Sequence, residues 1–597
     1  MALVSGVSGP KTSPRFLSIA IIEPAADGKV MSEQRNVILA VILSLAIMLV
    51  FQLVLMPPPP PADRQGAAPP SPATVSSPVE TQPGPPGLTP GTGPSHASRP
   101  DGPIARVRID TPSLHGSIAL AGGRLDTLAL VRYHVKPDPQ SSEIALLTPG
   151  GTPYYVDFGW VPVTPGIELP SATTRWTADS HHLSVDKPVT LTWTNKDGVI
   201  FSRTFSVDAH YMFTVQQKIE NRSGTPLTLA PYQALYRYGI PSTQGMYILH
   251  EGPLGVIGGV LREKDYEDLK EDGKIFRENS TGGWAGITDK YWLVALVPPQ
   301  DQKTAVRFLH QMVSAVDVYQ VDHIGPSQTV PPGGAIEAAG RVFAGAKEAW
   351  LLDHYAETLG VKKFDLAIDF GWFYFLTKPF FHALTFLHGL VGNFGVAILL
   401  FTVLIKALVF PLANKSYQAM SRMKKLQPEL KRLQERFSED RLRLNQEMMA
   451  LYKREKVNPA AGCLPILIQI PIFFALYKVL FVTIEMRHAP FFGWIRDLSA
   501  PDPTSLFNLF GLISWTPPAF LQIGVWPLIM GVTMWLQQKL NPQPTDPIQA
   551  RIFAVLPVMF TVMLAQFSAG LVIYWAWNNI LSILQQWVIM KKMGVKP

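Results

Sequence analysis

The chain is short of the residue types that most directly carry chemistry. It contains one cysteine, Cys463, which lies inside an apolar run. A disulfide framework within one chain and a multi-cysteine metal site are therefore both excluded. No P-loop motif occurs, so no ATP-driven motor is indicated. The inverted repeats found in many small-molecule transporters are not evident either.

Acidic residues are missing from the long apolar runs, and these runs dominate the composition. Of the 597 residues, 47% are hydrophobic and the mean hydropathy is positive, which is too apolar for one ordinary soluble domain. The isoelectric point is about 9.1. Because the basic residues concentrate in one segment between apolar runs, the charge indicates membrane topology and not specific nucleic-acid binding.

The N-terminal part contains one apolar run and one region that is poor in core-forming residues. Residues 37–56 are predicted to form an uncleaved transmembrane helix 1, with a cleaved signal peptide as the alternative. Residues 1–36 would be a cytoplasmic tail whose natural start is Met31. Residues 57–103 are rich in proline, glycine and serine, a composition that predicts a disordered linker.

Residues 104–355 have the pattern of a folded β-domain. Apolar and polar residues alternate in short runs at 189–195, 199–207 and 211–221, and turn-forming residues separate these runs. This period of two predicts antiparallel strands, and many strands over such a length predict a β-sandwich. The histidines show no metal-ligand spacing, so a binding or scaffolding domain is favoured over a hidden enzyme.

The helix predicted at residues 391–412 is central to the sequence. It is long enough to cross a bilayer, yet it carries Lys406, with Thr402 one turn earlier. A buried ammonium in such a helix usually faces protein or water, although snorkelling toward the nearer helix end, close to Pro411, is the alternative. The preceding residues 370–389 are aromatic-rich and are predicted to form an amphipathic helix at the membrane interface.

Residues 413–460 form the main charged segment. Twelve basic and six acidic side chains give it a net charge of +6, which places it in the cytoplasm by the positive-inside rule. Apolar residues at spacings of three and four predict a hairpin of two amphipathic helices, with a turn at residues 437–440. Its apolar face would either pack against its partner helix or dock a ribosome, lipid headgroups or a nascent chain. The residues assigned to this docking hairpin are Met420, Met423, Lys424, Lys425, Arg432, Met448 and Met449.

Four further spans complete a predicted total of six transmembrane helices with both termini in the cytoplasm. The β-domain then lies outside. The predicted boundaries after the hairpin are 461–482 for transmembrane helix 3, 483–520 for a periplasmic loop, 521–538 for helix 4, 539–551 for a cytoplasmic loop, 552–566 for helix 5, 571–590 for helix 6 and 591–597 for a cytoplasmic tail.

Polar residues recur in these spans although no acid neutralises Lys406. Such residues are tolerated where helices line a hydrated cavity. An unpaired cation in a groove open to cytoplasm and lipid would attract an acidic, partly polar guest segment and lower the free energy of its crossing. The groove residues predicted on this basis are Lys406, Thr402, Gln469, Thr533, Gln538 and Asn578.

Several stretches resemble the YidC membrane-protein insertase family. They are residues 426–473, the LIKALVFPL run, APFFGWIRDLSAPDP at 489–503, GVTMWLQQKL at 531–540 and FSAGLVIYWAWNNILSILQQ at 567–586. The resemblance covers nearly all of the chain from Met31 onward. Residues 505–526 are longer than the usual loop at that place.

The resemblance implies a polytopic α-helical membrane protein with a five-helix insertase core and a periplasmic all-β supersandwich. It implies a bacterial inner-membrane insertase and chaperone without enzymatic activity, cofactor or metal. The implied partners are nascent inner-membrane proteins, the phospholipid bilayer, the Sec translocon and the ribosome. The family's groove cation is commonly arginine, and Lys406 occupies that place here. The resemblance also implies that Thr402 and Trp575 line the path of the guest chain, which adds Trp575 to the predicted groove residues. A transporter and an externally anchored enzyme are the rival classes.

Overall fold

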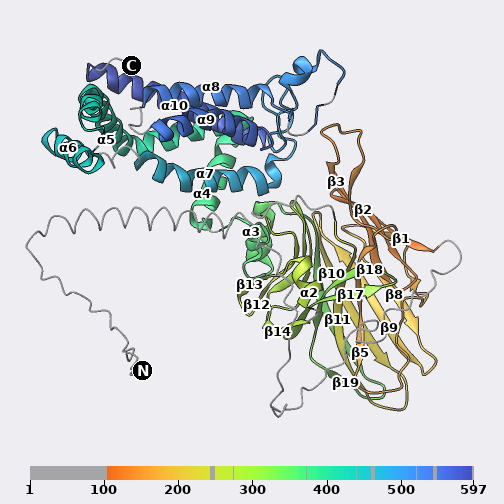
Figure 1. Ribbon diagram of the computed structural model, residues 1–597. Coiled ribbons are helices and arrows are strands. Elements are labelled where there is room, and N and C mark those ends of the chain that lie inside the picture. Colours follow the sequence, from red (N-terminus) through yellow and green to blue (C-terminus); the bar gives the residue numbers. More distant parts are fainter. Residues whose placement is uncertain are drawn as a thin grey trace, which may run out of the picture. The chain divides into compact units, whose positions relative to one another are not determined.

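The computed structural model describes residues 104–594 except 242–248, 273–274, 372, 439, 459–463, 516, 519–520 and 542–546. The predicted tail, first transmembrane helix and linker, residues 1–103, lie outside the described residues. The described chain has a β-domain followed by a helical region (Figure 1). This order agrees with the sequence expectation.

The β-domain consists of two large, mainly antiparallel sheets. The 11-stranded sheet has the order β14-β17-β18-β11-β5-β3-β2-β1-β7, with β19 beside β11 and β4 beside β3. Its strands are β1 Arg106–Asp110, β2 Leu114–Ala119, β3 Arg124–His134, β4 Glu143–Leu147, β5 Tyr154–Pro162, β7 His182–Leu183, β11 Leu227–Tyr238, β14 Phe276–Thr281, β17 Lys303–Val313, β18 Val316–Ile324 and β19 Gln328–Val330.

The second sheet has nine strands in the order β13-β12-β15-β16-β20-β10-β9-β8-β6. The three strands predicted from alternation at 189–195, 199–207 and 211–221 are confirmed and lie side by side in this sheet. Its strands are β6 Thr177–Ala178, β8 Val189–Thr194, β9 Val199–Val207, β10 Met212–Asn221, β12 Gly252–Ile257, β13 Val260–Glu263, β15 Trp284–Thr288, β16 Trp292–Val297 and β20 Ala335–Ala346.

Alternation along the strands builds the core between the sheets. In β9 every second residue is buried, beginning with Val199 and Phe201, and Phe205 meets Phe158 of β5 edge to face at 5.7 Å. The same buried row includes Arg203, which donates hydrogen bonds to the carbonyl oxygens of Gly123 and Phe158. A guanidinium can occupy a core position here because backbone oxygens accept hydrogen bonds from both of its terminal nitrogens.

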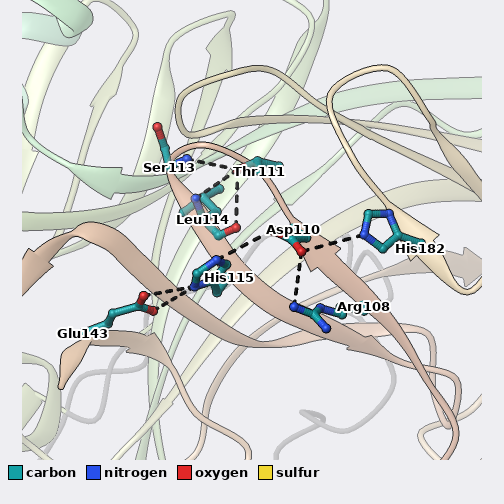
Figure 2. A network of polar contacts seen from close by, with 8 residues as sticks. All are labelled: Arg108, Asp110, Thr111, Ser113, Leu114, His115, Glu143 and His182. Carbon is teal, nitrogen blue, oxygen red and sulfur yellow. Dashed lines mark hydrogen bonds and ion pairs between the residues drawn. The ribbon is translucent and has the colours of Figure 1, made fainter. Parts of the chain in front are cut away.

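Histidines and acids gather on neighbouring strands of the 11-stranded sheet without forming a metal site. His115 contacts Glu143 at 3.0 Å and Asp110 at 3.7 Å, and Asp110 also faces His182 at 3.9 Å and Arg108 at 3.2 Å (Figure 2). No group of three or more potential ligands with metal-binding geometry occurs among the described residues. The contacts instead join β1, β2, β4 and β7 by side-chain charge.

The described helices of the helical region differ in length from the predicted ones. They are α4 Tyr374–Val391, α5 Phe394–Arg436, α6 Arg441–Arg454, α7 Leu464–Val482, α8 Val525–Leu540, α9 Pro547–Leu564 and α10 Ala569–Lys592. The remaining helical elements are α2 Tyr266–Asp272, α3 Ala349–Thr358, η1 Phe364–Ala367, η3 Ile484–Met486 and η4 Leu506–Gly511.

The predicted end of the central helix at Pro411 is wrong. Helix α5 runs for 43 residues through both Pro411 and Pro428, so the first helix of the hairpin is its direct continuation. A proline removes one backbone hydrogen bond, whereas packing beyond Pro411 supports the helix, because Tyr417 and Met420 bury against Ile589 of α10. Pro379 likewise lies inside α4, within the helix predicted at residues 370–389.

Few of the described helices have both the length and the hydropathy of a membrane-spanning helix. Among the described helices, α5 alone is long and apolar enough to cross a membrane, whereas Leu467–Val482 and Ala550–Leu564 are shorter apolar helices. Helix α10 packs chiefly on α8 and α5, and α9 packs on α8 (Figure 1). Helices α9 and α10 therefore each pack more extensively on α8 than on each other. Phe560 and Trp575 still join them, with ring centroids 5.9 Å apart.

A buried ion pair in the 11-stranded sheet provides a test of the β-domain's stability. Arg307 and Asp322 face each other across β17 and β18 with two contacts of 2.9 and 3.0 Å, and both are buried. Arg307→Leu leaves a buried carboxylate without its cation, and we expect it to lower the free energy of unfolding by about 3–5 kcal/mol. Denaturant unfolding of the full chain, followed by proteolysis of the β-domain, measures this change.

The double variant Arg307→Leu/Asp322→Leu is the matched control. It removes both charges, so it should recover most of the lost stability. Equal destabilisation in the single and double variants would show that packing, and not the unpaired charge, sets the effect.

Candidate functional site

Lys406 lies where α5 approaches α10. Its Nζ donates a hydrogen bond of 2.7 Å to the Ser582 hydroxyl, which in turn donates to the Asn578 carbonyl oxygen at 2.8 Å. Within the described part of the chain, no carboxylate forms an ion pair with Lys406. The Lys406 amine is therefore held by a neutral acceptor.

A cavity lies beside Lys406, between α5 and α7. It encloses about 440 Å³ of space, open solvent included, and its polar lining residues are Lys406, Tyr417 and Gln469. Apolar side chains such as Val409 and Ile472 line the rest. Gln469 is fixed by a hydrogen bond of 2.6 Å from its Nε2 to the Tyr574 hydroxyl. A mostly apolar hollow with one cation and one amide suits a guest chain that is mainly apolar with some polar groups.

The other predicted groove residues lie outside this cavity. The buried Thr402 donates its hydroxyl proton to Ile398 of its own helix at 2.7 Å. Thr533 accepts a hydrogen bond of 3.2 Å from Asn579, which joins α8 to α10. Gln538 donates to the Phe553 carbonyl oxygen and so joins α8 to α9. These residues satisfy polar groups between helices.

Trp575 and Asn578 lie on α10 close to the cavity's helices. The Trp575 ring meets Phe473 of α7 at 4.8 Å in an edge-to-face contact. Asn578 is buried, and its carbonyl oxygen holds Ser582, the partner of Lys406. Both residues therefore shape the wall behind the ammonium without lining the hollow.

The structure also divides the predicted docking hairpin. Met423 and Met448 pack around Leu426, Leu430 and Leu451 inside the hairpin. Met420 instead packs on α10, and Lys425 donates a hydrogen bond of 2.8 Å to the Met593 carbonyl oxygen. Met449 and Arg432 are exposed, and Lys424 is half-buried. Met423 and Met448 therefore pack inside the hairpin and Met420 packs on α10, which leaves Met449 as the exposed methionine of this set.

The turn of the hairpin follows the sequence expectation. Helix α6 begins after Asp440, whose carboxylate accepts a hydrogen bond of 3.0 Å from the backbone N–H of Arg443. An N-cap aspartate satisfies one of the free amides of the first turn. Arg454 near the other end of α6 pairs with Glu429 of α5 at 3.1 Å.

Sequence comparison places the chain among known proteins. Residues 106–383 match the family model described as YidC periplasmic domain, and residues 386–596 match the model described as 60Kd inner membrane protein. The membrane protein insertase YidC of Methylobacterium sp. (strain 4-46) is 48% identical over 95% of this chain and 96% of its own length. The chain belongs to the YidC membrane-protein insertase family.

A second relative agrees with this assignment. The membrane protein insertase YidC of Methylorubrum extorquens (strain PA1) is 48% identical, again over 95% of this chain and 96% of its own length. A solved YidC structure, described as an active insertase with its first transmembrane domain resolved, is 18% identical with a TM-score of 0.34. That alignment covers 81% of this chain and 93% of the solved chain.

The sequence analysis did not predict the hydrogen-bond partners of the groove residues. Ser582, Tyr574 and Asn579 provide the partners of Lys406, Gln469 and Thr533. A usable signal was present in α10, because Asn578, Ser582 and Gln586 recur every four residues and so share one helix face. All three are buried, which marks this polar stripe as an internal surface of the YidC-family core.

Ser582→Ala tests whether the position of the ammonium matters. The variant keeps the charge of Lys406 but removes its hydroxyl partner, a contact typically worth about 1.5–3 kcal/mol when one group is charged. We expect insertion of a client protein into proteoliposomes to fall, but less than in Lys406→Ala.

Ser582→Thr is the control for this experiment, because it keeps the hydroxyl. It should insert clients at close to the native rate. An equal loss in the alanine and threonine variants would mean that packing at position 582, and not the hydrogen bond, is responsible.

Proposed function

We propose that this protein inserts and folds inner-membrane proteins through the cavity beside Lys406, alone or together with the Sec translocon. The carrying observation is the Lys406 ammonium, which is bound to a neutral hydroxyl at the edge of a hollow between α5 and α7. Membership of the YidC family supplies the activity class, because the relatives are named membrane protein insertases.

The physical basis of the proposal is a lowered free energy of crossing for polar chain. Unsatisfied polar groups in hydrocarbon cost several kcal/mol each, and a fixed cation attracts an acidic guest by about 4 kcal/mol at 4 Å in a medium of intermediate dielectric constant. No bond is made or broken in this scheme. The groove holds a hydrophilic flank while the apolar segment passes sideways into lipid.

The proposed topology has six transmembrane helices, of which the first is residues 37–56. The other five are formed by the membrane part of α5 and by α7, α8, α9 and α10. Both termini and the hairpin of α5 and α6 lie in the cytoplasm, because the basic residues concentrate there. The β-domain lies in the periplasm, and the described range 106–383 matches the family's periplasmic domain.

The hairpin is proposed as a docking surface for a nascent chain, a ribosome or lipid headgroups. Its support is the exposed basic surface, which includes Arg432, together with the exposed Met449. Methionine side chains adapt to varied apolar partners. Met423 and Met448 pack inside the hairpin and Met420 packs on α10, so these three methionines take no part in this surface.

Substitution of Lys406 tests the role of the charge. Lys406→Ala removes the cation, and we expect it to slow insertion by about tenfold or more, the effect of about 1.4 kcal/mol. Lys406→Arg keeps the charge with a planar head group and should retain most activity. Complementation of a strain depleted of its own insertase, together with client insertion in proteoliposomes, measures both variants. Equal complementation by the two variants would refute a role for the charge.

Crosslinking tests the path of the client. A photoreactive amino acid at position 469, in the cavity, and at position 449, on the hairpin, should react with a stalled nascent membrane protein. The same probe in place of Leu408, which is 77% exposed on α5, should react mainly with lipid. Comparable client adducts from positions 408 and 469 would show that the client does not pass through the cavity.

A further inference from the structure

The segment between α7 and α8 carries a large exposed apolar surface that the proposed function does not use. No charged residue occurs between Asp502 and Lys539. Around η4, leucine, phenylalanine, isoleucine and tryptophan side chains are exposed, and Leu512 reaches 86% exposure. We call this set the apolar loop surface: Leu506, Phe507, Leu509, Phe510, Leu512, Ile513 and Trp515.

The base of this segment is tied firmly to the start of α8. The buried Asp502 accepts a hydrogen bond of 2.9 Å from the backbone N–H of Trp526, in the first turn of α8. Ser505 donates its hydroxyl proton to the Leu521 carbonyl oxygen at 3.1 Å, and the Leu506 N–H donates to Ile523 at 2.9 Å. The apolar loop surface is thus held beside the end of a helix.

Two residues of the loop have an unfavourable backbone conformation. Leu509 and Phe510 have φ angles of 50° and 57°, a left-handed conformation that bulky residues rarely adopt. Both side chains are nevertheless about half exposed. Burial of these two side chains within the described protein therefore does not offset the conformational energy of this turn.

The preceding loop extends the apolar area. Phe492 is 63% exposed and Trp494 is 45% exposed. The Trp494 indole donates a hydrogen bond of 3.1 Å to Asp502, the same carboxylate that holds the start of α8. Two separate stretches of chain therefore present aromatic side chains next to one helix end.

We propose that the apolar loop surface inserts into the headgroup–acyl boundary of the bilayer, in the leaflet where α8 begins. The proposal rests on the proposed function for the crossing of α8. A surface tied to the first turn of a spanning helix lies at the depth of the membrane interface. Tryptophan favours that depth, and the absence of charge over the whole segment removes the electrostatic penalty of leaving water.

The bilayer fits this surface better than a protein partner does. The exposed faces of α8 continue the same chemistry, with Val532 at 57% and Trp535 at 45% exposure. Segment and helix thus both expose apolar side chains, and a lipid surface covers such side chains without specific shape. The loop would act as a second anchor that fixes the depth and tilt of α8.

Depth-dependent fluorescence quenching tests the proposal on the full chain. Cys463→Ser removes the sole cysteine, and Leu512→Cys is then labelled with an environment-sensitive dye in phosphatidylcholine–phosphatidylglycerol vesicles. Nitroxide lipids labelled at a shallow acyl position should quench the dye strongly, and aqueous iodide should quench it severalfold less than a dye at Val163→Cys. Val163 is an exposed residue of the β-domain.

The outcomes separate the inference from the proposed function. A dye at Val532→Cys reports the crossing of α8, and its quenching by deep nitroxide lipids is expected from the proposed topology alone. If the dye at 532 is quenched by lipid and the dye at 512 is quenched by iodide as strongly as at 163, the inference is overturned. Shielding of position 512 from both quenchers also overturns it, because a protein partner and not lipid would then cover the loop.

Discussion

The arrangement of the helical region depends on one unpaired charge in an apolar environment. A lysine ammonium inside such helices is costly unless protein or water solvates it. Here the ammonium donates a hydrogen bond to a hydroxyl of α10, and that hydroxyl donates to a backbone carbonyl of the same helix. An open hollow lies on the side of α7. No acidic residue occurs in α7, α8, α9 or α10, or in the membrane part of α5. In the proposed function this attraction serves a guest chain.

The neighbouring helices support this arrangement by satisfying their own polar groups. Gln469 binds Tyr574 and Thr533 binds Asn579, so polar residues that look alike in the sequence have two roles. Some face the hollow, and others connect helices. The distinction matters because interhelical polar contacts in membranes stabilise the association of helices. A polar residue that faces a cavity is instead free to contact a molecule that enters the cavity.

The long helix α5 connects the two ends of the proposed mechanism. Its first half carries Thr402 and Lys406, and its second half forms the hairpin with α6. Because the helix is continuous through Pro411, the hairpin and the ammonium belong to one element. The contact of Tyr417 and Met420 with α10 lies between these two points.

Much of the fold was predictable from local pattern. The alternation at 199–207 specified β9 because a strand with one buried face must alternate, and Asp440 specified the start of α6 because it caps free amides. Proline was misleading at 411, since the loss of one hydrogen bond was outweighed by packing on α10. The sequence showed that Lys406 had no acidic partner, but a hydroxyl partner 176 positions along the chain has no local signature.

The sequence by itself determined that an unneutralised cation, a basic hairpin and an uncharged segment after Asp502 exist, because composition and periodicity are properties of the chain. Only the tertiary structure decided which polar residues face a hollow and which face another helix. It also decided that the apolar segment is tied to the first turn of α8. The physical reason is that such contacts join distant residues, and their geometry is set by how the helices pack against one another.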